Sequence, residues 1–411
     1  MRDLRELFED AVDPAPPPNR LTAAEVYDAG RRRHHRRLTA AAAAGATALA
    51  VAAVAVHVLS PAPLTGDRPP VAGRATTTGE TGPIPAGLIV WAGAADRDHL
   101  YLALSSCRPG PPCQKQDLVV VGSTDGGRTW HGRGEPVPAG PMTVVGPDTL
   151  VAAPITGAAG TEQQLLSSRD GGRTWVPAPA GAPVEAVPDG DAVICWSPQA
   201  AEPCVLYAVD PATGAVGPLA NQPKLAMRRD ELRIDEAAGR LQVTGTDSAT
   251  GRPAVSTSTD AGRTWFTHVF TDAPPCAKPQ CVPLLLAVAG TATAYAVTAV
   301  GPDRIVYRSD DAGTRWQRLT AVVPPGAVAN TFVTADGSHV LCHLVDGRDA
   351  DVRRCWALRG GGAYQAVELD GLPTSAGPVR RAPDGWFYAP DPGGVLYGST
   401  DGWHWSPLTR R

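Results

Sequence analysis

The stretch STDGGRTW at residues 123–130 determines how this sequence is interpreted, because four close relatives of it recur along the chain. They are SSRDGGRTW at 167–175, STDAGRTW at 258–265, SDDAGTRW at 309–316 and STDGWHW at 399–405, the last being one residue short. Each combines Ser, Asp, Gly and Trp in the same order, and these residue types favour a tight turn followed by an aromatic anchor. We call these five stretches the boxes.

The spacing of the boxes defines a repeat. Separations of 45, 90, 51 and 90 residues lie between the box aspartates, which are Asp125, Asp170, Asp260, Asp311 and Asp401. The two gaps of 90 residues predict two further units, whose degenerate turns are DPATGAV at 210–216 and RGGGAY at 359–364. Six intervals over 276 residues then average 46 residues, a period that suits the four-stranded blade of a β-propeller.

The composition indicates an all-β protein. The 411 residues include 44 Gly and 41 Pro, which favour short strands and many turns. The first unit contains four strand-like segments, GLIVWAGA, HLYLALSSC, DLVVVGS and WHGRGEPV, with the first box between the last two. Leu118–Val121 is a continuous apolar run, which is typical of a strand packed on both faces. We therefore predict a seven-bladed β-propeller over residues 86–411, a closed ring that leaves few strand edges exposed.

The boxes are predicted to be structural turns between the third and fourth strands of a blade. The Asp accepts backbone N–H groups, the Gly adopts a positive φ, the Ser supports the turn, and the Trp packs in the core. A track of aromatic rings for sugar stacking is the alternative, but successive boxes lie on different blades. The residues assigned to these turns are Ser123, Asp125, Gly127, Trp130, Asp170, Gly172, Trp175, Asp260, Gly262, Trp265, Asp311, Gly313, Trp316, Asp401 and Trp405.

The N-terminal part differs from the rest in composition. RRRHHRR at 31–37 precedes residues 38–59, which contain no Asp, Glu, Lys or Arg. Roughly 22 residues at about 1.5 Å each span the ~30 Å hydrocarbon layer, which predicts one transmembrane helix. The basic block favours a cytoplasmic N-terminus and an external C-terminus. A cleaved signal peptide is the alternative, although the leader is long for one, and His34 and His35 are interpreted as interfacial charge rather than metal ligands.

Four parts of the chain are therefore expected. They are a cytoplasmic basic segment at 1–37, the transmembrane helix at 38–59, a Pro-, Thr- and Gly-rich linker at 60–85 and the propeller at 86–411. The formal net charge of −4 gives no field that implies a nucleic-acid partner.

All eight cysteines follow the apolar segment and form four short-range pairs. A zinc site would favour C-x2-C knuckles or added His ligands, whereas an even count at local spacings outside the cell favours disulfides. Buried free thiols are the alternative. No metal or cofactor is expected, and the predicted disulfides are Cys107–Cys113, Cys195–Cys204, Cys276–Cys281 and Cys342–Cys355.

The boxes closely resemble the Asp-box, or BNR, repeat of sialidase-like β-propellers, and the resemblance covers residues 86–411. It implies the propeller fold. The same box occurs in sialidases, xyloglucan-active glycosidases, sortilin-type receptors and a photosystem assembly factor, in which it resembles a scaffold turn away from the central site. The resemblance therefore does not imply one function.

The sequence departs from the sialidase pattern at the residues that carry its chemistry. Sialidases have an R-I-P motif whose Arg helps to clamp the substrate carboxylate, but GPIP stands here at 82–85, with Pro83 in place of that Arg. Arg108, in a C-R-P sequence where the family often has G-R-P, is the one residue that carries over as an anion-binding candidate, and a surface arginine is its alternative. The loop RPGPPCQKQ at 108–116 has no carboxylate for the family's acid/base, and Asp117 is predicted to begin a strand.

A catalytic tyrosine is also not identified, because Tyr364, Tyr388 and Tyr397 match no family context, and no catalytic residue is assigned. The sequence favours a membrane-tethered extracellular propeller that binds an unknown protein or glycan in the cell envelope. One alternative is a sialidase-type glycoside hydrolase. Another is an envelope sensor whose residues 1–37 bind a cytoplasmic partner such as a sigma factor, since the Arg- and Ala-rich start resembles actinobacterial membrane proteins, some of them anti-sigma-like.

Overall fold

The computed structural model describes residues 87–105, 117–154, 164–197, 203–227, 234–237, 240–275, 284–289, 292–300, 303–323, 328–345, 352–359 and 362–408. All of them belong to the second of two units into which the chain divides, Thr78–Arg411. Within these ranges there is no helix long and apolar enough to cross a membrane. The membrane helix predicted at 38–59, the basic segment and the linker lie outside the described residues.

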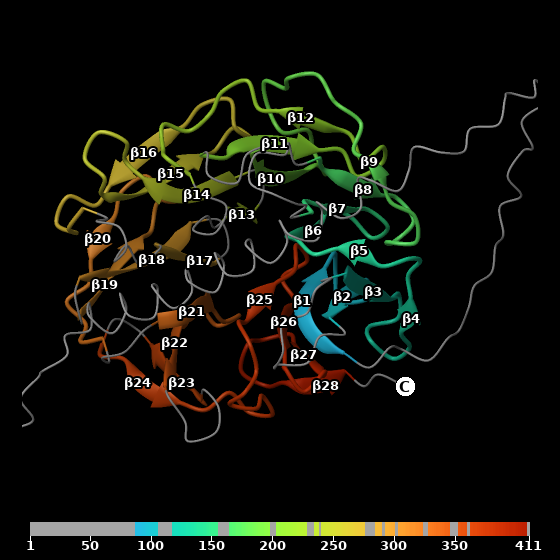
Figure 1. Ribbon diagram of the computed structural model, residues 1–411. Coiled ribbons are helices and arrows are strands. Elements are labelled where there is room, and N and C mark those ends of the chain that lie inside the picture. The colour runs from blue at the N-terminus through green and yellow to red at the C-terminus, as the bar shows by residue number, and fades with distance from the viewer. Residues whose placement is uncertain are drawn as a thin grey trace, which may run out of the picture. The chain divides into compact units, whose positions relative to one another are not determined.

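Seven antiparallel sheets, each made of consecutive strands, follow one another around a ring as the blades of a propeller (Figure 1). Blades 1 to 3 comprise β1 (Leu88–Ala94), β2 (Leu100–Ser105), β3 (Asp117–Ser123), β4 (His131–Gly132) and β5 (Val137–Pro138); β6 (Met142–Val144), β7 (Leu150–Ala152), β8 (Leu166–Ser168) and β9 (Val176–Pro177); β10 (Ala192–Trp196), β11 (Val205–Val209) and β12 (Val216–Pro218). Blades 4 and 5 comprise β13 (Ile234–Ala237), β14 (Arg240–Thr246), β15 (Pro253–Ser258) and β16 (Phe266–Val269); β17 (Leu285–Ala289), β18 (Thr293–Val300), β19 (Asp303–Ser309) and β20 (Gln317–Arg318). Blades 6 and 7 comprise β21 (Val328–Val333), β22 (His339–Val345), β23 (Val352–Leu358) and β24 (Gln365–Val367); β25 (Arg380–Arg381), β26 (Phe387–Pro390), β27 (Leu396–Ser399) and β28 (Ser406–Leu408).

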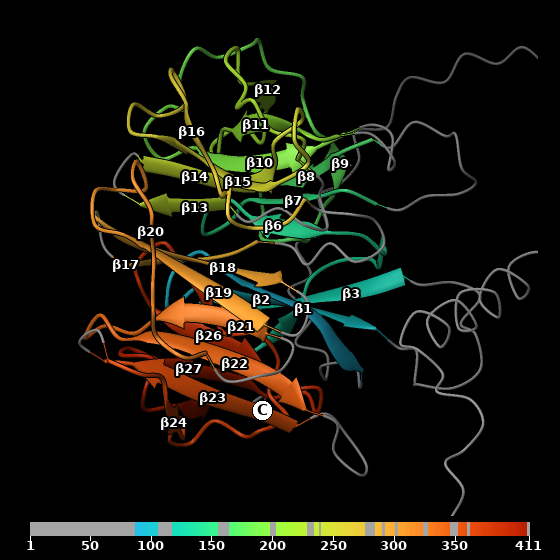
Figure 2. The same ribbon diagram turned by 90° about the vertical axis from the view of Figure 1, so that its left-hand side faces the viewer.

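The prediction of an all-β, seven-bladed propeller is confirmed, including the two units with degenerate turns (Figure 2). The turn at 210–215 joins β11 to β12, and the second degenerate stretch lies between β23 and β24, although residues 360 and 361 are outside the described residues. Each of the five boxes likewise lies between the third and fourth strands of its blade. The period of the sequence repeat is thus the period of the blades.

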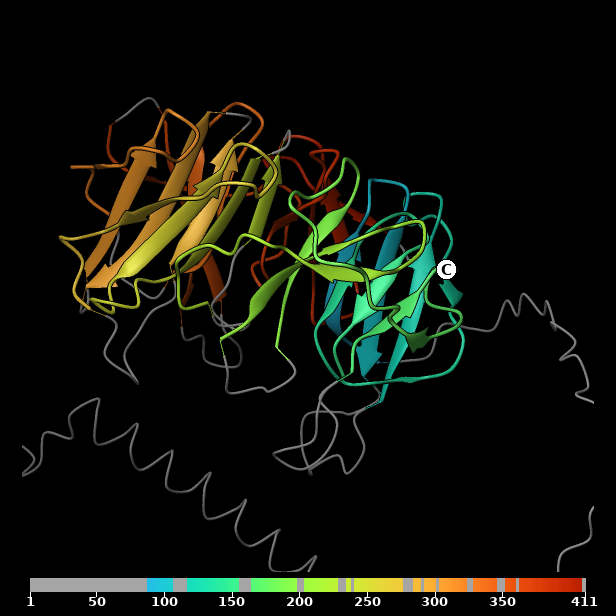
Figure 3. The same cartoon turned by 90° about the horizontal axis from the view of Figure 1, so that it is seen from above.

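The hydrophobic core lies between the blades. Each of the seven clusters of buried side chains among the described residues draws on two neighbouring blades, including blade 1 and blade 7. Figure 3 shows the strands of blades 4 and 5, yellow and orange, side by side. In the cluster between these blades, Val255 and Phe270 pack with Leu286 and Ile305. Because inner strands are covered on both faces, β2 is buried along its whole length and shows no polar alternation.

Blade 3 lacks an innermost strand among the described residues. The segment 184–187 precedes β10, where such a strand is expected, but it runs beside the outer strand β12 instead. The Val184 N–H donates to Pro218 O at 2.9 Å, and the Ala220 N–H donates to Val184 O at 2.8 Å. These bonds divert the segment from the centre of its own blade.

One glycine of each box, the second where the box has two, packs against the preceding blade. A Cβ added at Gly127 would lie 2.8 Å from Leu408 Cβ of blade 7, and one added at Gly172 would lie 3.1 Å from Val120 Cγ1 of blade 1. The same relation joins Gly262 to Leu219, Gly313 to Gln242 and Thr257, and Gly402 to Thr334. The box is therefore a joint between neighbouring blades, which explains why the chain repeats it.

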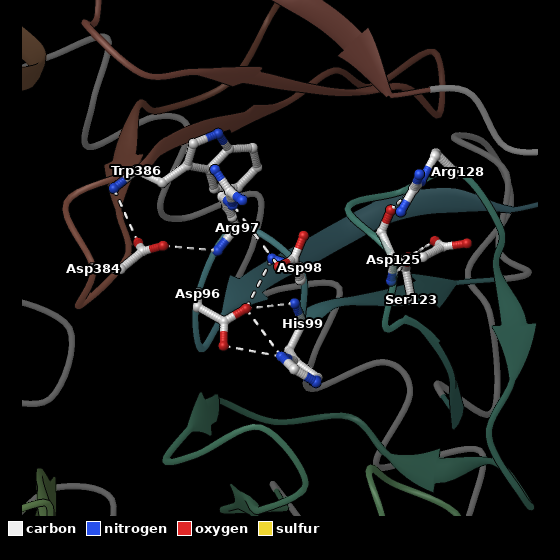
Figure 4. A network of polar contacts seen from close by, with 9 residues as sticks. All are labelled: Asp96, Arg97, Asp98, His99, Ser123, Asp125, Arg128, Asp384 and Trp386. Carbon is white, nitrogen blue, oxygen red and sulfur yellow. Dashed lines mark hydrogen bonds and ion pairs between the residues drawn. The ribbon is translucent and has the colours of Figure 1, made fainter.

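The ring closes between blade 1 and blade 7 through side chains (Figure 4). The Arg97 N–H donates to Asp384 Oδ2 at 3.0 Å, and Arg380 Nη1 donates to Ala92 O at 3.3 Å. Among the described residues, no backbone–backbone hydrogen bond joins the two blades. Packing and a few polar contacts hold this seam.

Two predicted disulfides are confirmed. Cys195–Cys204 joins β10 to the residue before β11, and Cys342–Cys355 joins directly opposed residues of β22 and β23. Each stays within one blade. The predicted pairs Cys107–Cys113 and Cys276–Cys281 lie outside the described residues.

Replacing both Cys342 and Cys355 by Ala is expected to lower the free energy of unfolding by about 2–3 kcal/mol, because the bridge closes a short loop in the unfolded chain. Urea-induced unfolding of the full-length protein measures the loss. Reduction should destabilise the native protein more than the double variant, because only the native protein has the Cys342–Cys355 bridge to lose, whereas Cys195–Cys204 is opened in both. Recovery of both cysteines as free thiols by peptide mapping without reduction would contradict the assignment.

Candidate functional site

Hydrogen bonds within the turn engage both carboxylate oxygens of the box aspartates. Asp125 Oδ1 accepts from Ser123 Oγ at 2.8 Å and from the Thr129 N–H at 2.9 Å, while Oδ2 accepts from Thr129 Oγ1 at 2.6 Å. Burial opposes ionisation, but the bonds from Thr129 and Ser123 outweigh it and lower the pKa of Asp125 to about 2. A carboxylate held ionised in this way does not serve as a proton donor at neutral pH.

The box tryptophans do not all lie in the core. Trp130 and Trp405 are buried as expected, but Trp175, Trp265 and Trp316 are only partly buried and pack at the edges of their clusters. In four boxes the indole N–H donates to the carbonyl of the same box, for example Trp130 Nε1 to Gly127 O at 3.0 Å. These three rings pack against core clusters as predicted, although each remains partly exposed.

Trp265 is the exception to this bonding pattern. Its Nε1 donates to Asn221 O at 2.9 Å, across the junction with blade 3. The same box contains Ala261 with a φ of 58°, a conformation that glycine adopts more readily. Ala312 of the blade 5 box has nearly the same φ, 61°, so the blade 4 box differs from its relatives in the bonding of its indole and not in its backbone.

Several residues considered from the sequence lie outside the described residues, including Pro83, Arg108 and the loop after it. Asp117 begins β3, where it pairs with Pro138. Tyr364 is buried and bonds His339 Nδ1 through its hydroxyl at 2.6 Å, and burial raises its pKa. Burial also raises the pKa of Tyr388. These two side chains are core groups, and a raised pKa is the opposite of what an activated nucleophile needs.

A shallow cleft of about 500 Å³ lies between the segment 184–189 and the blade 4 box. Its walls are Val184, Glu185, Ala186, Val187, Pro188, Asp189, Ala261 and Arg263. The Val187 N–H donates to Ala261 O at 2.7 Å and ties the two walls together. We call this feature the blade 3–4 cleft. It lies where the segment 184–187 departs from the innermost-strand position, so its position follows from the irregularity of blade 3.

The blade 3–4 cleft combines apolar walls with charged groups of both signs. Glu185 and Asp189 are exposed, and Arg263 is exposed with its Nη1 donating to Asp260 O at 3.3 Å. Asn221 Nδ2 donates to Glu185 Oε2 at 3.4 Å, and this Asn also accepts the Trp265 indole through its carbonyl. Such a surface can hold a ligand by apolar contact and charge. No clustering of three or more His, Cys, Asp or Glu side chains suited to a metal is found in the part of the chain that the structure describes.

Nothing in the sequence marked the blade 3–4 cleft. VEAV at 184–187 has the apolar character of a strand, and STDAGRTW has the same pattern as the other boxes. Only the pairing of Val184 with β12 reveals that the innermost strand is lost.

The blade 7 box carries a titratable group that the other boxes lack. His404 takes the bonding position of Thr129, with its Nδ1 lying 2.6 Å from Asp401 Oδ2. This hydrogen bond raises the pKa of His404, and hydrogen bonds from His404 and Trp403 lower that of Asp401 against the opposing effect of burial. At any pH between the lowered pKa of Asp401 and the raised pKa of His404, both side chains are charged and form an ion pair.

The His404→Thr variant is expected to lose one pH-dependent contribution to stability. Since the folded-state pKa of His404 is raised, its contribution is present in full below the ordinary His value and is lost as pH rises through the raised pKa. The difference in melting temperature between the two full-length proteins, followed from about pH 5 to pH 9, should shrink over that window. NMR titration of His404 at or below the ordinary His value would contradict this expectation.

Comparison with known proteins gives the fold only. No family model matches the chain, and no curated protein matches it. Similar solved structures include YCF48 bound to D1 peptide, with 16% identity and a TM-score of 0.28 over 78% of this chain and 66% of that one. The GH93 α-L-arabinofuranosidase of Fusarium graminearum shows 13% identity and a TM-score of 0.40 over 76% and 90% of the two chains. The β-propeller domain of the Trilobed protease from Pyrococcus furiosus shows 9% identity and a TM-score of 0.45 over 78% and 96%.

This chain spans just under two thirds of the YCF48 structure. At these identities and TM-scores, the activities and partners of the three proteins are not carried over to this chain.

Proposed function

We propose that this protein is a membrane-tethered, extracellular β-propeller of the Asp-box, sialidase-like type that binds a protein or glycan of the cell envelope without catalysing its conversion. The observation that carries the binding role is the blade 3–4 cleft, whose charged and apolar side chains surround an accessible volume of about 500 Å³. The hydrogen bond from the Val187 N–H to Ala261 O connects its two walls, and a preformed site lowers the entropy cost of binding.

The proposed location rests on the disulfides and the N-terminal sequence. Disulfides such as Cys195–Cys204 and Cys342–Cys355 persist in oxidising compartments outside the cytoplasm. The basic block at 31–37 followed by the uncharged residues 38–59 favours an anchor with its N-terminus inside. Protease added to intact cells should then cut the linker at 60–85 and release a folded, disulfide-containing propeller. A propeller that is protected until the membrane is broken would refute this topology.

The lack of catalysis is supported by the state of the box residues. The carboxylates available in the boxes are ionised and engaged in their turns, and Pro83 stands where a sialidase has a clamping Arg. The full-length protein in detergent is expected to leave a fluorogenic sialoside intact. Turnover abolished by Arg108→Ala would move the protein to the glycoside hydrolases.

Charge reversal in the cleft is expected to weaken binding. Envelope proteins and wall polysaccharide from the native host serve as immobilised probes for the full-length protein. The variant Glu185→Lys with Asp189→Lys should reduce the affinity for the retained probe at least about tenfold, because it reverses the charge beside the apolar walls. Glu135→Lys, an exposed change on blade 1, is the matched control. Equal binding by the cleft variant and the control would remove the cleft as the binding surface.

A further inference from the structure

The degenerate turn of blade 6 joins the preceding blade in a different way from the boxes. Gly362 is the described glycine of the stretch RGGGAY, and nothing lies within 4 Å of a Cβ added there. Tyr364, the last residue of the stretch, directly precedes β24, just as each box tryptophan directly precedes the fourth strand of its blade. A buried tyrosine therefore takes the place of the tryptophan in blade 6.

The Tyr364 hydroxyl bonds a histidine of the neighbouring strand. In four boxes the tryptophan donates to a carbonyl of its own turn, but Tyr364 Oη lies 2.6 Å from Nδ1 of His339. His339 begins β22 and is fully buried, and its ring stacks on Tyr295 of blade 5 with centroids 4.1 Å apart and planes inclined by 6°. The stack crosses the junction of blades 5 and 6. We call Tyr295, His339 and Tyr364 the aromatic joint.

The hydrogen-bond partners of His339 assign its ring proton. Nε2 lies 2.6 Å from Thr331 Oγ1, and the Thr331 hydroxyl donates to Val340 O at 3.1 Å. Since a carbonyl only accepts, the threonine proton is used there, and its oxygen accepts from the Nε2–H. Nδ1 is then the unprotonated nitrogen and accepts the Tyr364 O–H. Both hydrogen bonds thus match a neutral ring.

The charged groups on the elements around the ring have partners of their own. Arg308, which lies 5.9 Å from the centre of the Tyr295 ring, pairs with Asp310 at 2.8 Å. Asp336, before β22, accepts the Trp403 indole N–H at 3.1 Å. Two further titratable or charged side chains lie against aromatic rings, namely His343 and Arg359. The hydrogen bonds of the His339 ring therefore go to the uncharged Thr331 and Tyr364.

A second proton on the ring is strongly unfavourable in this arrangement. It would lie on Nδ1, facing the proton that the Tyr364 hydroxyl already directs there. The positive charge would also be buried beside apolar side chains of the junction, such as Leu341 and Leu358. Burial accordingly lowers the pKa of His339 to about 3.

We propose that the aromatic joint is acid-sensitive, and that mild acid releases blade 6 from blade 5 because the opened histidine takes up a proton for which the closed joint has no acceptor. In the opened chain His339 has its ordinary pKa of 6.5, whereas the closed ring stays neutral down to about pH 3. The stability that the joint provides is therefore complete above about pH 6.5 and is lost progressively as the pH falls below that value. This inference does not depend on the blade 3–4 cleft or on the function proposed above.

Urea-induced unfolding of the full-length protein in detergent at pH 8 and pH 4.5 tests the role of the ring. The variant His339→Gln has no group at this position that titrates in that range. The unfolding equilibrium constant should rise about 100-fold more in the wild type than in His339→Gln between the two pH values. His131→Gln, a change on β4 at a partly exposed histidine, is the matched control and should keep the wild-type rise. An equal rise in the wild type and His339→Gln would overturn the proposal.

Tyr364→Phe distinguishes the proposed proton linkage from a packing role. A hydroxyl that only packs would be missed equally at both pH values. If it donates to Nδ1, its loss removes a bond from the neutral ring and makes protonation of the closed joint easier. The variant should therefore be less stable than the wild type at pH 8 and should lose less further stability at pH 4.5. A pH response as large as that of the wild type would contradict the assigned tautomer and the proposal.

Hydrogen exchange of the wild-type protein locates the opening without any variant. After correction for the pH dependence of the intrinsic exchange rate, the amide N–H groups of β24, which follow Tyr364, should lose about 100-fold in protection between pH 8 and pH 4.5. Those of β28, which follow the buried Trp405 in blade 7, should change by less than about fivefold. An equal loss in both strands would show that acid acts on the whole fold rather than on this joint, and the proposal would fail.

Discussion

Replacing Arg353 by Ala is expected to lower the free energy of unfolding by about 3–5 kcal/mol, because three carbonyl groups each lose a hydrogen bond from a buried charged group. Arg353 is 6% exposed on β23 and donates to Ala376 O at 3.0 Å, Gly377 O at 2.9 Å and Pro373 O at 2.8 Å. These carbonyls belong to the connection between blades 6 and 7. Burial lowers the pKa of Arg353 to about 10, so the side chain remains charged at neutral pH.

Arg354 provides the control, since it is the next residue on the same strand but is exposed. Arg354→Ala should change the free energy of unfolding by less than about 0.5 kcal/mol. Urea-induced unfolding of the full-length proteins measures both values. A similar loss in the two variants would mean that the connection between the blades does not depend on the carbonyl contacts of Arg353.

Replacing Gly313 by Ala is expected to cost about 2–4 kcal/mol, which combines backbone strain with overpacking of the joint between blades 4 and 5. Gly313 has a φ of 86°, and a Cβ there would overlap the side-chain amide of Gln242 and lie 2.7 Å from Thr257 Oγ1. Both neighbours are buried, which leaves them little room to move.

Gly337 separates the two contributions. Its φ of 83° is nearly the same, but nothing lies within 4 Å of an added Cβ. Gly337→Ala should therefore show the backbone cost alone, about 1 kcal/mol. If urea-induced unfolding gives the same loss of unfolding free energy for both variants, Gly313 is needed only for its backbone conformation, and the joint between blades 4 and 5 has room for a methyl group.

The number of blades could be predicted because the spacing between box aspartates equals the length of one four-stranded blade, or of two where a box is degenerate. The position of each box followed from its residues, since Ser, Asp and Gly form a turn by local bonds such as those of Asp125 with Thr129. Two disulfides could be paired because their cysteines are 9 and 13 residues apart. These features depend on interactions that are near in sequence.

The rest depends on contacts between blades, which the sequence does not place side by side. Trp265 has the same sequence context as Trp130 but bonds Asn221, a residue of the preceding junction. Arg133 and Arg353 have a residue type that is usually exposed, and their burial requires Gly122 or carbonyls from another blade. The blade 3–4 cleft was missed for the same reason, and Arg108 remains a prediction.

The seam between blades 1 and 7 has a consequence for the order in which the protein is made. Arg97 and Asp384, which meet there, are 287 residues apart, whereas the other joints connect blades that are synthesised one after the other. Until β28 leaves the ribosome, blade 1 has no partner for the apolar side chains that it shares with blade 7. The nascent chain therefore carries an exposed apolar face through the synthesis of five further blades, and such a face is what chaperones recognise.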